Sequence, residues 1–136
     1  MTIAVGTSLD SARLNTKSPY DLAFWASSFI ADGSPDDYFD SGPETDGLSM
    51  LTWSAGQVGI EMPDDYVTTL QLLTQNEIPI ETALKTRGAI LIGTTSLGVC
   101  MGLDDAICVV SGRYFQIRTT TSAWEGAGQL PGLIYS

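Results

Sequence analysis

Residues 45–63 read T-D-G-L-S-M-L-T-W-S-A-G-Q-V-G-I-E-M-P, and this stretch decides how the rest of the chain is interpreted. Thr45 or Asp46 supplies a side-chain oxygen of the kind that accepts hydrogen bonds from the free amides of a helix start. Apolar residues then recur at helical spacing, at Leu48, Leu51, Ala55 and Val58. Pro63 forbids continuation of the helix, because proline lacks the amide proton. The stretch therefore predicts a capped helix with one apolar face.

Composition predicts one folded domain. The chain has 136 residues, and 43% of them are hydrophobic, which is enough for a core of useful size. No stretch resembles a membrane span, and the start M-T-I-A-V-G-T-S-L-D lacks the basic flank and long apolar run of a secretory signal. We expect an N-terminal arm over residues 1–17, a single domain over residues 18–136, and synthesis in the cytoplasm without export by that route.

The charge balance argues against nucleic acid as a partner. Six basic residues face sixteen acidic ones, and the formal net charge of −10 repels phosphate backbones and anionic lipid. Between Lys17 and Lys85 there is no basic residue at all. An acidic first half of this kind serves solubility, and the more specific interpretation is a basic surface on a neighbouring protein subunit.

Cysteine and histidine usage predicts no metal site and no cofactor. Cys100 and Cys108 flank an expected turn inside apolar runs, where cysteine behaves as a small buried hydrophobe; a hairpin disulfide is the alternative. The chain has no histidine and no cysteine cluster. The absence of histidine also removes the commonest general base.

The remaining elements follow in an α+β order. Ser18, Pro19 and Asp21 mark a helix start, and an apolar stripe predicts a helix over residues 18–31. Turn residues predict a loop over 32–44, and a second amphipathic pattern follows Pro63, with a helical turn over 80–85. Four short β-type runs come next, at residues 89–93, 97–102, 106–110 and 113–119.

Turn residues between these runs predict antiparallel hairpins, at 103–105 and at 111–112. We therefore expect N-terminal helices packed on a C-terminal antiparallel sheet. The tail after Thr121 has no strong element, and four of its side chains are available to dock on the sheet: Trp124, Leu130, Ile134 and Tyr135.

At this point the order of motifs resembles the NlpC-type papain-like cysteine peptidases, which cleave the peptide stems of bacterial cell wall. In that family an aromatic-containing loop precedes an Asp-Cys-Ser-Gly-Leu motif that opens the central helix. Here residues 33–42 resemble the loop, Trp53 the aromatic residue within the helix, and residues 59–63 its Gly-Ile/Val and Leu-Pro exit. The resemblance places Asp46 on the motif's Asp and Gly47 on the nucleophilic Cys.

Downstream, residues 87–92 resemble the family's Pro-Gly-Asp-Leu-Val-Phe strand, and residues 96–102 its His-Val-Gly-Ile-Tyr-Leu-Gly strand. Ser96 then stands at the general-base His. The next strand supplies the family's third, orienting polar residue, and Val109 is its approximate counterpart here. The likeness covers about residues 18–118, with motifs that are individually weak.

The resemblance implies a papain-like fold without peptidase activity. A thiolate at a helix N-terminus is stabilised by the free amides, and a nearby imidazole takes its proton. Glycine has no nucleophile, and serine does not accept a proton near neutral pH. We expect a structural component of an assembly, such as a phage tail tip in the virion. The alternative is a module in which a vestigial cleft at Asp46, Gly47 and Ser96, roomier for lack of the Cys, binds peptidoglycan stem peptide.

Replacement chemistry has few candidates in this sequence. Ser49 lies near the helix start, but no Lys or His is placed by sequence to activate it. We interpret Asp46 first as a helix cap rather than as an acid catalyst. Cys100 lies in an apolar strand, where a raised thiol pKa is expected. Four aromatic side chains could line a sugar-binding groove, although at helical spacing aromatics usually pack in a core: Trp25, Trp53, Tyr66 and Trp124.

Overall fold

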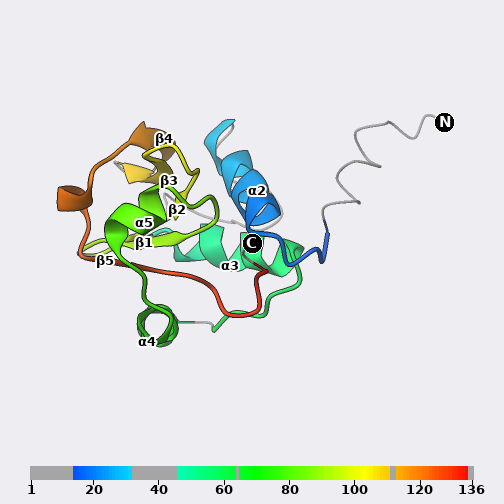
Figure 1. The fold of residues 1–136 in the computed structure, drawn as a ribbon. Coiled ribbons are helices and arrows are strands. Elements are labelled where there is room, and N and C mark those ends of the chain that lie inside the picture. Colours follow the sequence, from blue (N-terminus) through cyan, green and yellow to red (C-terminus); the bar gives the residue numbers. More distant parts are fainter. Residues whose placement is uncertain (1–13, 32–45, 64, 111–112, 135–136) are drawn as a thin grey trace.

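The computed structural model describes residues 14–31, 46–63, 65–110 and 113–134, and within them helices precede strands (Figure 1). The helices are α2 (Pro19–Ala31), α3 (Leu48–Gln57), α4 (Tyr66–Gln75) and α5 (Ile80–Leu84). The strands are β1 (Ile90–Ile92), β2 (Leu97–Cys100), β3 (Asp105–Val110), β4 (Arg113–Arg118) and β5 (Gly126–Gly128), with a 3-10 turn η1 (Thr121–Ala123) before β5. The α+β class expected from the sequence is confirmed.

The strands form one antiparallel sheet in the order β4-β3-β2-β1-β5. The first four strands are joined in sequence as a meander, so the predicted hairpin order is confirmed. Val99 of β2 pairs with Ile90 of β1 on one side and with Ile107 of β3 on the other. The four predicted β-type runs all contain a strand, with ends shifted by a few residues.

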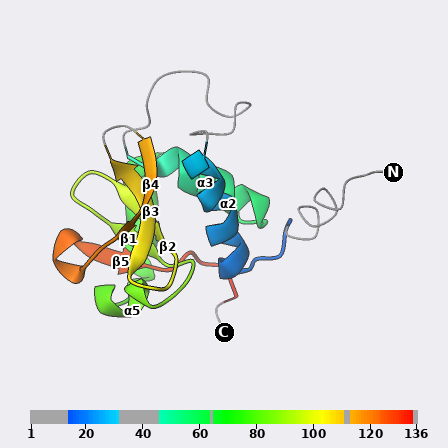
Figure 2. The ribbon, with the colours of Figure 1, turned by 90° about the horizontal axis from the view of Figure 1, so that it is seen from above.

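The sheet lies between two unequal layers (Figure 2). Helices α2 and α3 cover one face, and α5 with η1 covers part of the other. Alternation along the strands sends one set of side chains to each layer, because successive side chains of a strand point to opposite faces. Ile90, Val99 and Ile107 therefore face α2 and α3, while Leu91 and Cys100 face α5.

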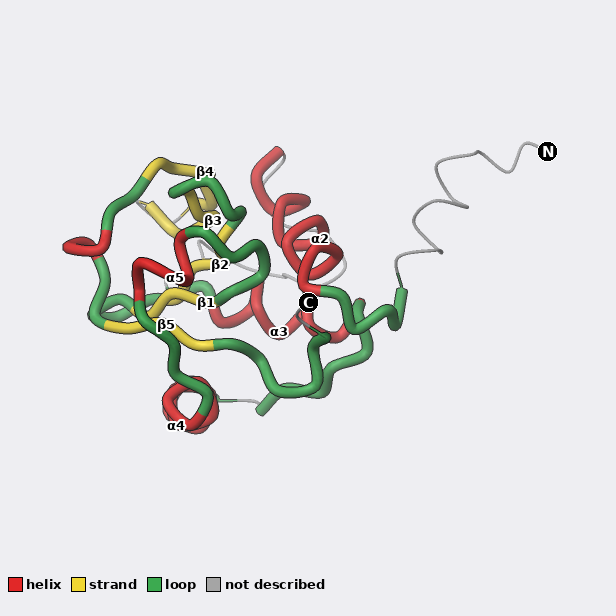
Figure 3. Tube along the Cα trace, in the orientation of Figure 1, coloured by secondary structure: helices red, strands yellow, loops and turns green. Residues whose placement is uncertain are grey.

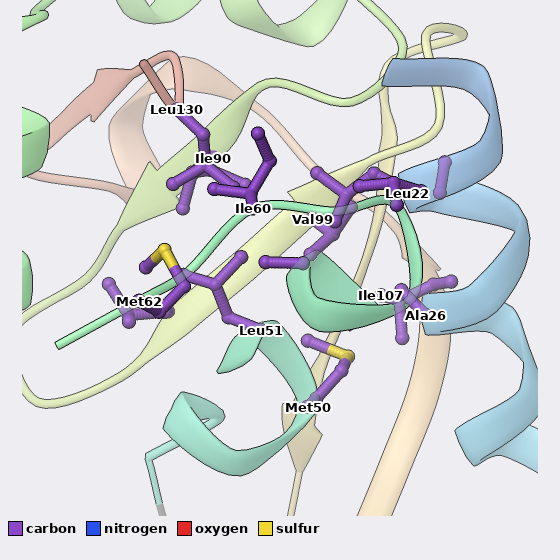
Figure 4. Close-up of a cluster of buried hydrophobic side chains, with 14 of the residues drawn as sticks. Leu22, Ala26, Met50, Leu51, Ile60, Met62, Ile90, Val99, Ile107 and Leu130 are labelled. Atoms are coloured by element: carbon purple, nitrogen blue, oxygen red, sulfur yellow. The ribbon is translucent and has the colours of Figure 1, made fainter. Parts of the chain in front are cut away.

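The larger core fills the space between α2, α3 and the sheet (Figure 4). Leu22 and Ala26 of α2 and Met50 and Leu51 of α3 are completely buried against this face of the sheet. Ring contacts extend this packing from helix to sheet, since the Phe29 ring meets the rings of both Trp53 and Tyr114 edge-on. Burying the apolar stripes of two helices against one sheet face explains why both helices form here.

Local signals explain how α2 begins. The Ser18 hydroxyl accepts a hydrogen bond from the Asp21 amide at 3.3 Å, which satisfies one free amide of the first turn. Pro19 occupies the first helical position, where its missing amide proton costs nothing. The predicted helix over residues 18–31 is confirmed to within one residue.

Helix α3 begins later than the stretch suggested. The Asp46 carboxylate accepts a hydrogen bond from the Leu48 amide at 2.9 Å, so the expected capping role of Asp46 is confirmed. The cap position itself is Gly47, with φ of 76° in the left-handed region. After the helix, Ile60 and Met62 return the chain to the larger core.

The next two helices connect α3 to the sheet. Asp65 caps α4 by accepting from the Thr68 amide at 2.8 Å, and Leu73 is buried in the larger core. Helix α5 is a single short segment whose Ala83 and Leu84 pack on the other face of the sheet. Both segments were predicted as helical.

The tail contains a strand that the sequence did not predict. Gly126–Gly128 forms β5, which pairs with β1 at the edge of the sheet. A Cβ on Gly128 would lie 2.5 Å from the Leu73 carbonyl oxygen, so the close approach of α4 requires a residue without a side chain there. Glycine and alanine have low strand propensity, so the sequence Gly-Ala-Gly does not indicate a strand.

The predicted docking of the tail is correct for Leu130 and Trp124 but not for Ile134. Leu130 is buried and Trp124 is partly buried against the sheet, but Ile134 is 68% exposed. The tail is held there by its backbone, because the Ile134 amide donates to the Lys17 carbonyl at 2.8 Å. Figure 3 shows the loop after β5 running back to the start of α2. The hydrophobic docking expected of Ile134 was therefore wrong.

Several expectations fall outside the described residues. They are most of the arm over 1–17, the loop over 32–44 with Tyr38 and Phe39, the turn at 111–112, and Tyr135. The described end of the arm does dock, since the Asn15 amide donates to the Gln57 carbonyl at 2.7 Å. Among the helices of the described ranges, none is long and apolar enough to cross a bilayer.

Two leucines test the position of the core. Leu51→Ala removes a fully buried side chain between α3 and the sheet and should lower the free energy of unfolding by about 2–5 kcal/mol. Leu103→Ala is the matched control, because Leu103 is 76% exposed and its loss should change stability by less than about 0.5 kcal/mol. Urea unfolding followed by circular dichroism measures both, and equal losses would contradict the assignment of the core.

Candidate functional site

The start of α3 is joined to the start of β2 by a backbone hydrogen bond. The Leu97 amide donates to the Asp46 carbonyl oxygen at 2.8 Å. The Asp46 side chain meanwhile holds the Leu48 amide, so both acceptors of this residue are used in positioning the helix start. This contact joins two segments that the family resemblance also pairs. One is the helix aligned with the family's nucleophile helix, and the other is the strand that follows Ser96, the residue aligned with the general base.

Gly47 has no space for a side chain. A Cβ built on its backbone would lie 2.6 Å from the Leu97 carbonyl oxygen, and the three nearest heavy atoms all belong to the Leu97 backbone. Its left-handed φ adds a second obstacle, because side chains of L-residues clash with their own backbone there. The roomier cleft expected at Gly47 is therefore wrong: the strand backbone fills the space that a cysteine would need.

Ser96 lies beside this contact, but its side chain is placed elsewhere. Its hydroxyl oxygen lies over Gly93 across the β1–β2 turn, 3.4 Å from where a Cβ of that glycine would sit. Its carbonyl accepts from the Gly93 amide at 2.7 Å, which closes the turn. Ser96 is thus close to Gly47 only because it precedes Leu97, and its side chain does not point toward Gly47.

Val109 completes the set on the neighbouring strand. The β2–β3 register pairs Val99 with Ile107, and continuing it by two residues places Val109 opposite Leu97. Val109 packs against the larger core and pairs with Tyr114 of β4. The structure therefore brings Gly47 against the backbone of Leu97, the residue after Ser96, while Val109 lies on the neighbouring strand. Glycine and valine have no group that could act as a nucleophile or a base.

One residue in this region was missed by sequence reasoning: Leu97, because an apolar strand residue gives no signal that its backbone will touch a distant helix start. Tyr66, named from the sequence as an aromatic candidate, packs against the larger core, and its hydroxyl oxygen is buried without a hydrogen-bond partner in the described parts of the chain. Burial, together with the Asp46 and Glu125 carboxylates, raises the pKa of Tyr66. Tyr66 therefore stays protonated at neutral pH and is not a general base.

The other replacement candidates do not assemble into a catalytic group. Within the described ranges, no hydrogen bond links Ser49 to a basic side chain, and no group of three potential metal ligands occurs. The aromatic residues are divided by the sheet, because Trp25 and Trp53 stack edge-on in the larger core while Trp124 packs on the α5 side. The core interpretation of these aromatics is confirmed for Trp25 and Trp53.

Comparison with known proteins adds no assignment. A scan against protein-family models finds no match, and a search of curated proteins finds no similar sequence.

Substitution at Gly47 tests the contact with Leu97. Gly47→Ala should lower the free energy of unfolding by about 2 kcal/mol, from the left-handed backbone and the approach to the Leu97 carbonyl. Gly56→Ala, in the same helix with nothing near its Cβ, should instead raise stability by about 0.5–1 kcal/mol. Chemical denaturation compares the two, and a neutral Gly47→Ala would show that the site has room after all.

The two cysteines test whether a thiol nucleophile exists. Both are free and buried, and burial followed by the Asp105 charge raises the pKa of Cys100 to about 12. At pH 8 only about one Cys100 in 10⁴ is a thiolate. Ellman's reagent should therefore leave Cys100 unmodified in the folded protein and label both cysteines in urea. Rapid labelling of folded protein at Cys100 would contradict its inert role.

The same shift has a consequence for stability. The pKa of Cys100 in the folded chain lies above the ordinary value of 9.0, so the unfolded chain loses its thiol proton first as pH rises. Stability should fall as pH increases above about 9.

Proposed function

We propose that this chain is a degenerate NlpC-type peptidase-like domain that acts as a structural component of an assembly, such as a phage tail tip. The observation that carries the proposal is the Leu97 carbonyl, which occupies the space of a nucleophilic side chain at Gly47. Support comes from the contact between Gly47 and Leu97, which joins the start of α3 to the strand that follows Ser96, two segments that carry catalytic groups in the family that the sequence resembles.

The charge distribution supports an assembly role. Thirteen of the sixteen acidic residues precede Thr82, where only Arg13 and Lys17 are basic. A body with this imbalance pairs well with basic surfaces on neighbouring subunits, because complementary potentials steer and orient association. The geometry gives less support to a stem-peptide binding module, since the cleft on which that alternative rests is filled at Gly47.

Fractionation of the source cells tests the proposal. Particles banded on a density gradient should contain peptides of this chain in constant ratio to their tail proteins, measured by quantitative mass spectrometry. The soluble fraction should be depleted of the chain. Recovery of the whole pool as a free monomer, with none in particles, would overturn the structural assignment.

Two assays with the purified chain separate the remaining classes. Muropeptides should give no new products, with an active NlpC-type enzyme as the positive control, and hydrolysis would contradict the loss of activity. Insoluble cell wall should fail to retain the chain in a pull-down. Specific retention that competes with soluble stem peptide would favour the binding module instead.

A further inference from the structure

A pocket of about 390 Å³ lies on the side of the sheet that α5 covers, away from Gly47. It is formed where α5, the β2–β3 turn and the end of β4 meet. Its lining consists of Glu81, Leu84, Lys85, Asp104, Arg118 and Thr119–Thr121. Its volume falls in the range of small-molecule sites, which is about 300–1,000 Å³.

Backbone hydrogen bonds hold the walls of this pocket together. The Asp104 amide donates to the Leu84 carbonyl at 3.1 Å, and the Thr119 amide donates to the Asp104 carbonyl at 2.9 Å. The Thr119 hydroxyl accepts from the Trp124 indole at 2.8 Å. Asp104 also adopts a left-handed φ of 59° at the turn. Three separate segments are thus fixed relative to one another before any ligand arrives.

The charged groups of the pocket differ in whether they have partners. Lys85 and Asp104 form an ion pair at 2.7 Å and neutralise each other. For Arg118 and Glu81, no ion pair or hydrogen bond of the side chain occurs within the described parts of the chain. Asp105, which faces Arg118 across the β3–β4 ladder, instead accepts from the Gln116 amide group and the Leu103 backbone. Glu81 and Arg118 are both solvent-exposed residues, so the lining offers one guanidinium and one carboxylate that protein groups do not neutralise.

Three simple ligand classes fit this lining poorly. A phosphate or other pure anion meets Glu81 as well as Arg118, and a metal ion has no group of three ligands in the described part of the chain. A sugar finds no aromatic ring in the lining to stack on. A ligand with one carboxylate and one ammonium group satisfies both unpaired charges at once.

We propose that this pocket binds a zwitterionic amino compound, either a free α-amino acid or a short peptide with free ends. Its carboxylate lies on Arg118, whose planar guanidinium suits bidentate carboxylate binding. Its ammonium lies on Glu81. Leu84 contacts the aliphatic part, and the Thr121 hydroxyl is placed to meet the peptide or amino group, whereas the Thr120 hydroxyl already shares a hydrogen bond with Ser122 at 3.1 Å. This binding is independent of the assembly role, so each proposal fails or stands on its own experiment.

The test uses the full chain and defined probes. L-Alanyl-L-alanine is titrated against isotope-labelled protein, and the indole N–H resonance of Trp124 is followed because that group donates to a pocket residue. L-Alanine distinguishes an amino-acid from a peptide ligand. The N-acetylated and the amidated dipeptide each remove one charge and should bind at least about tenfold more weakly, as expected for loss of a charged hydrogen bond.

Variants assign the two charges. Arg118→Gln should weaken dipeptide binding about tenfold and leave little difference between the dipeptide and its amide. Glu81→Gln should do the same for the dipeptide and its N-acetylated form. Arg113→Gln is the matched control, since Arg113 lies on the same strand, is exposed and does not line the pocket. Circular dichroism confirms that each variant is folded.

The outcomes are decisive in both directions. The site is supported by a shift of the Trp124 resonance that saturates with dipeptide or L-alanine, provided that Arg118→Gln raises the apparent Kd about tenfold while Arg113→Gln leaves it unchanged. No shift at 50 mM of either probe overturns it, with that concentration set at roughly the weak limit of specific binding. Equal affinity for the dipeptide and both capped forms also overturns it, because charge recognition would then be absent.

Discussion

The hydrogen bond from the Leu97 amide to the Asp46 carbonyl joins the two halves of the structure. It fixes the start of α3 against the start of β2, and the apolar face of α3 then meets the sheet in a single orientation. Met50 and Leu51 of that face are buried, and α2 packs on α3 through its own apolar stripe. The close approach leaves no room for a side chain at Gly47, so the same contact that positions α3 also requires glycine at this position.

Local signals in the sequence were sufficient for most of the fold. Ser18 and Pro19 mark the start of α2 because capping and proline chemistry act within one turn. The hairpin at residues 103–105 follows from turn residues beside apolar strands. Strand β5 was not predictable in this way, because Gly-Ala-Gly becomes a strand only by pairing with β1 and by admitting the Leu73 carbonyl at Gly128. Its existence depends on tertiary contacts.

The candidate site shows the same division. The family resemblance singled out Gly47 by aligning it with a nucleophilic cysteine, and the structure also makes that residue exceptional, as the left-handed cap of α3. What the sequence could not give was the conformation of Gly47 or the identity of the group that fills the space beside it. Leu97 carries no chemical signal, since it acts through backbone atoms that every residue possesses. Positions defined by backbone approach are therefore visible only in three dimensions.

The sheet order has a consequence for how the chain folds. Strands β1 to β4 pair with sequence neighbours through short turns, whereas β5 pairs with β1 across the three intervening strands. Helix α3 meets β2 from far upstream. Closing long loops costs more chain entropy than closing short ones, so local pairings form at lower cost. We therefore expect the meander to form the folding nucleus and the α3–β2 contact to form later, because it closes a longer loop. Gly47, which sets how closely α3 and β2 approach, would then be constrained only when that late contact forms.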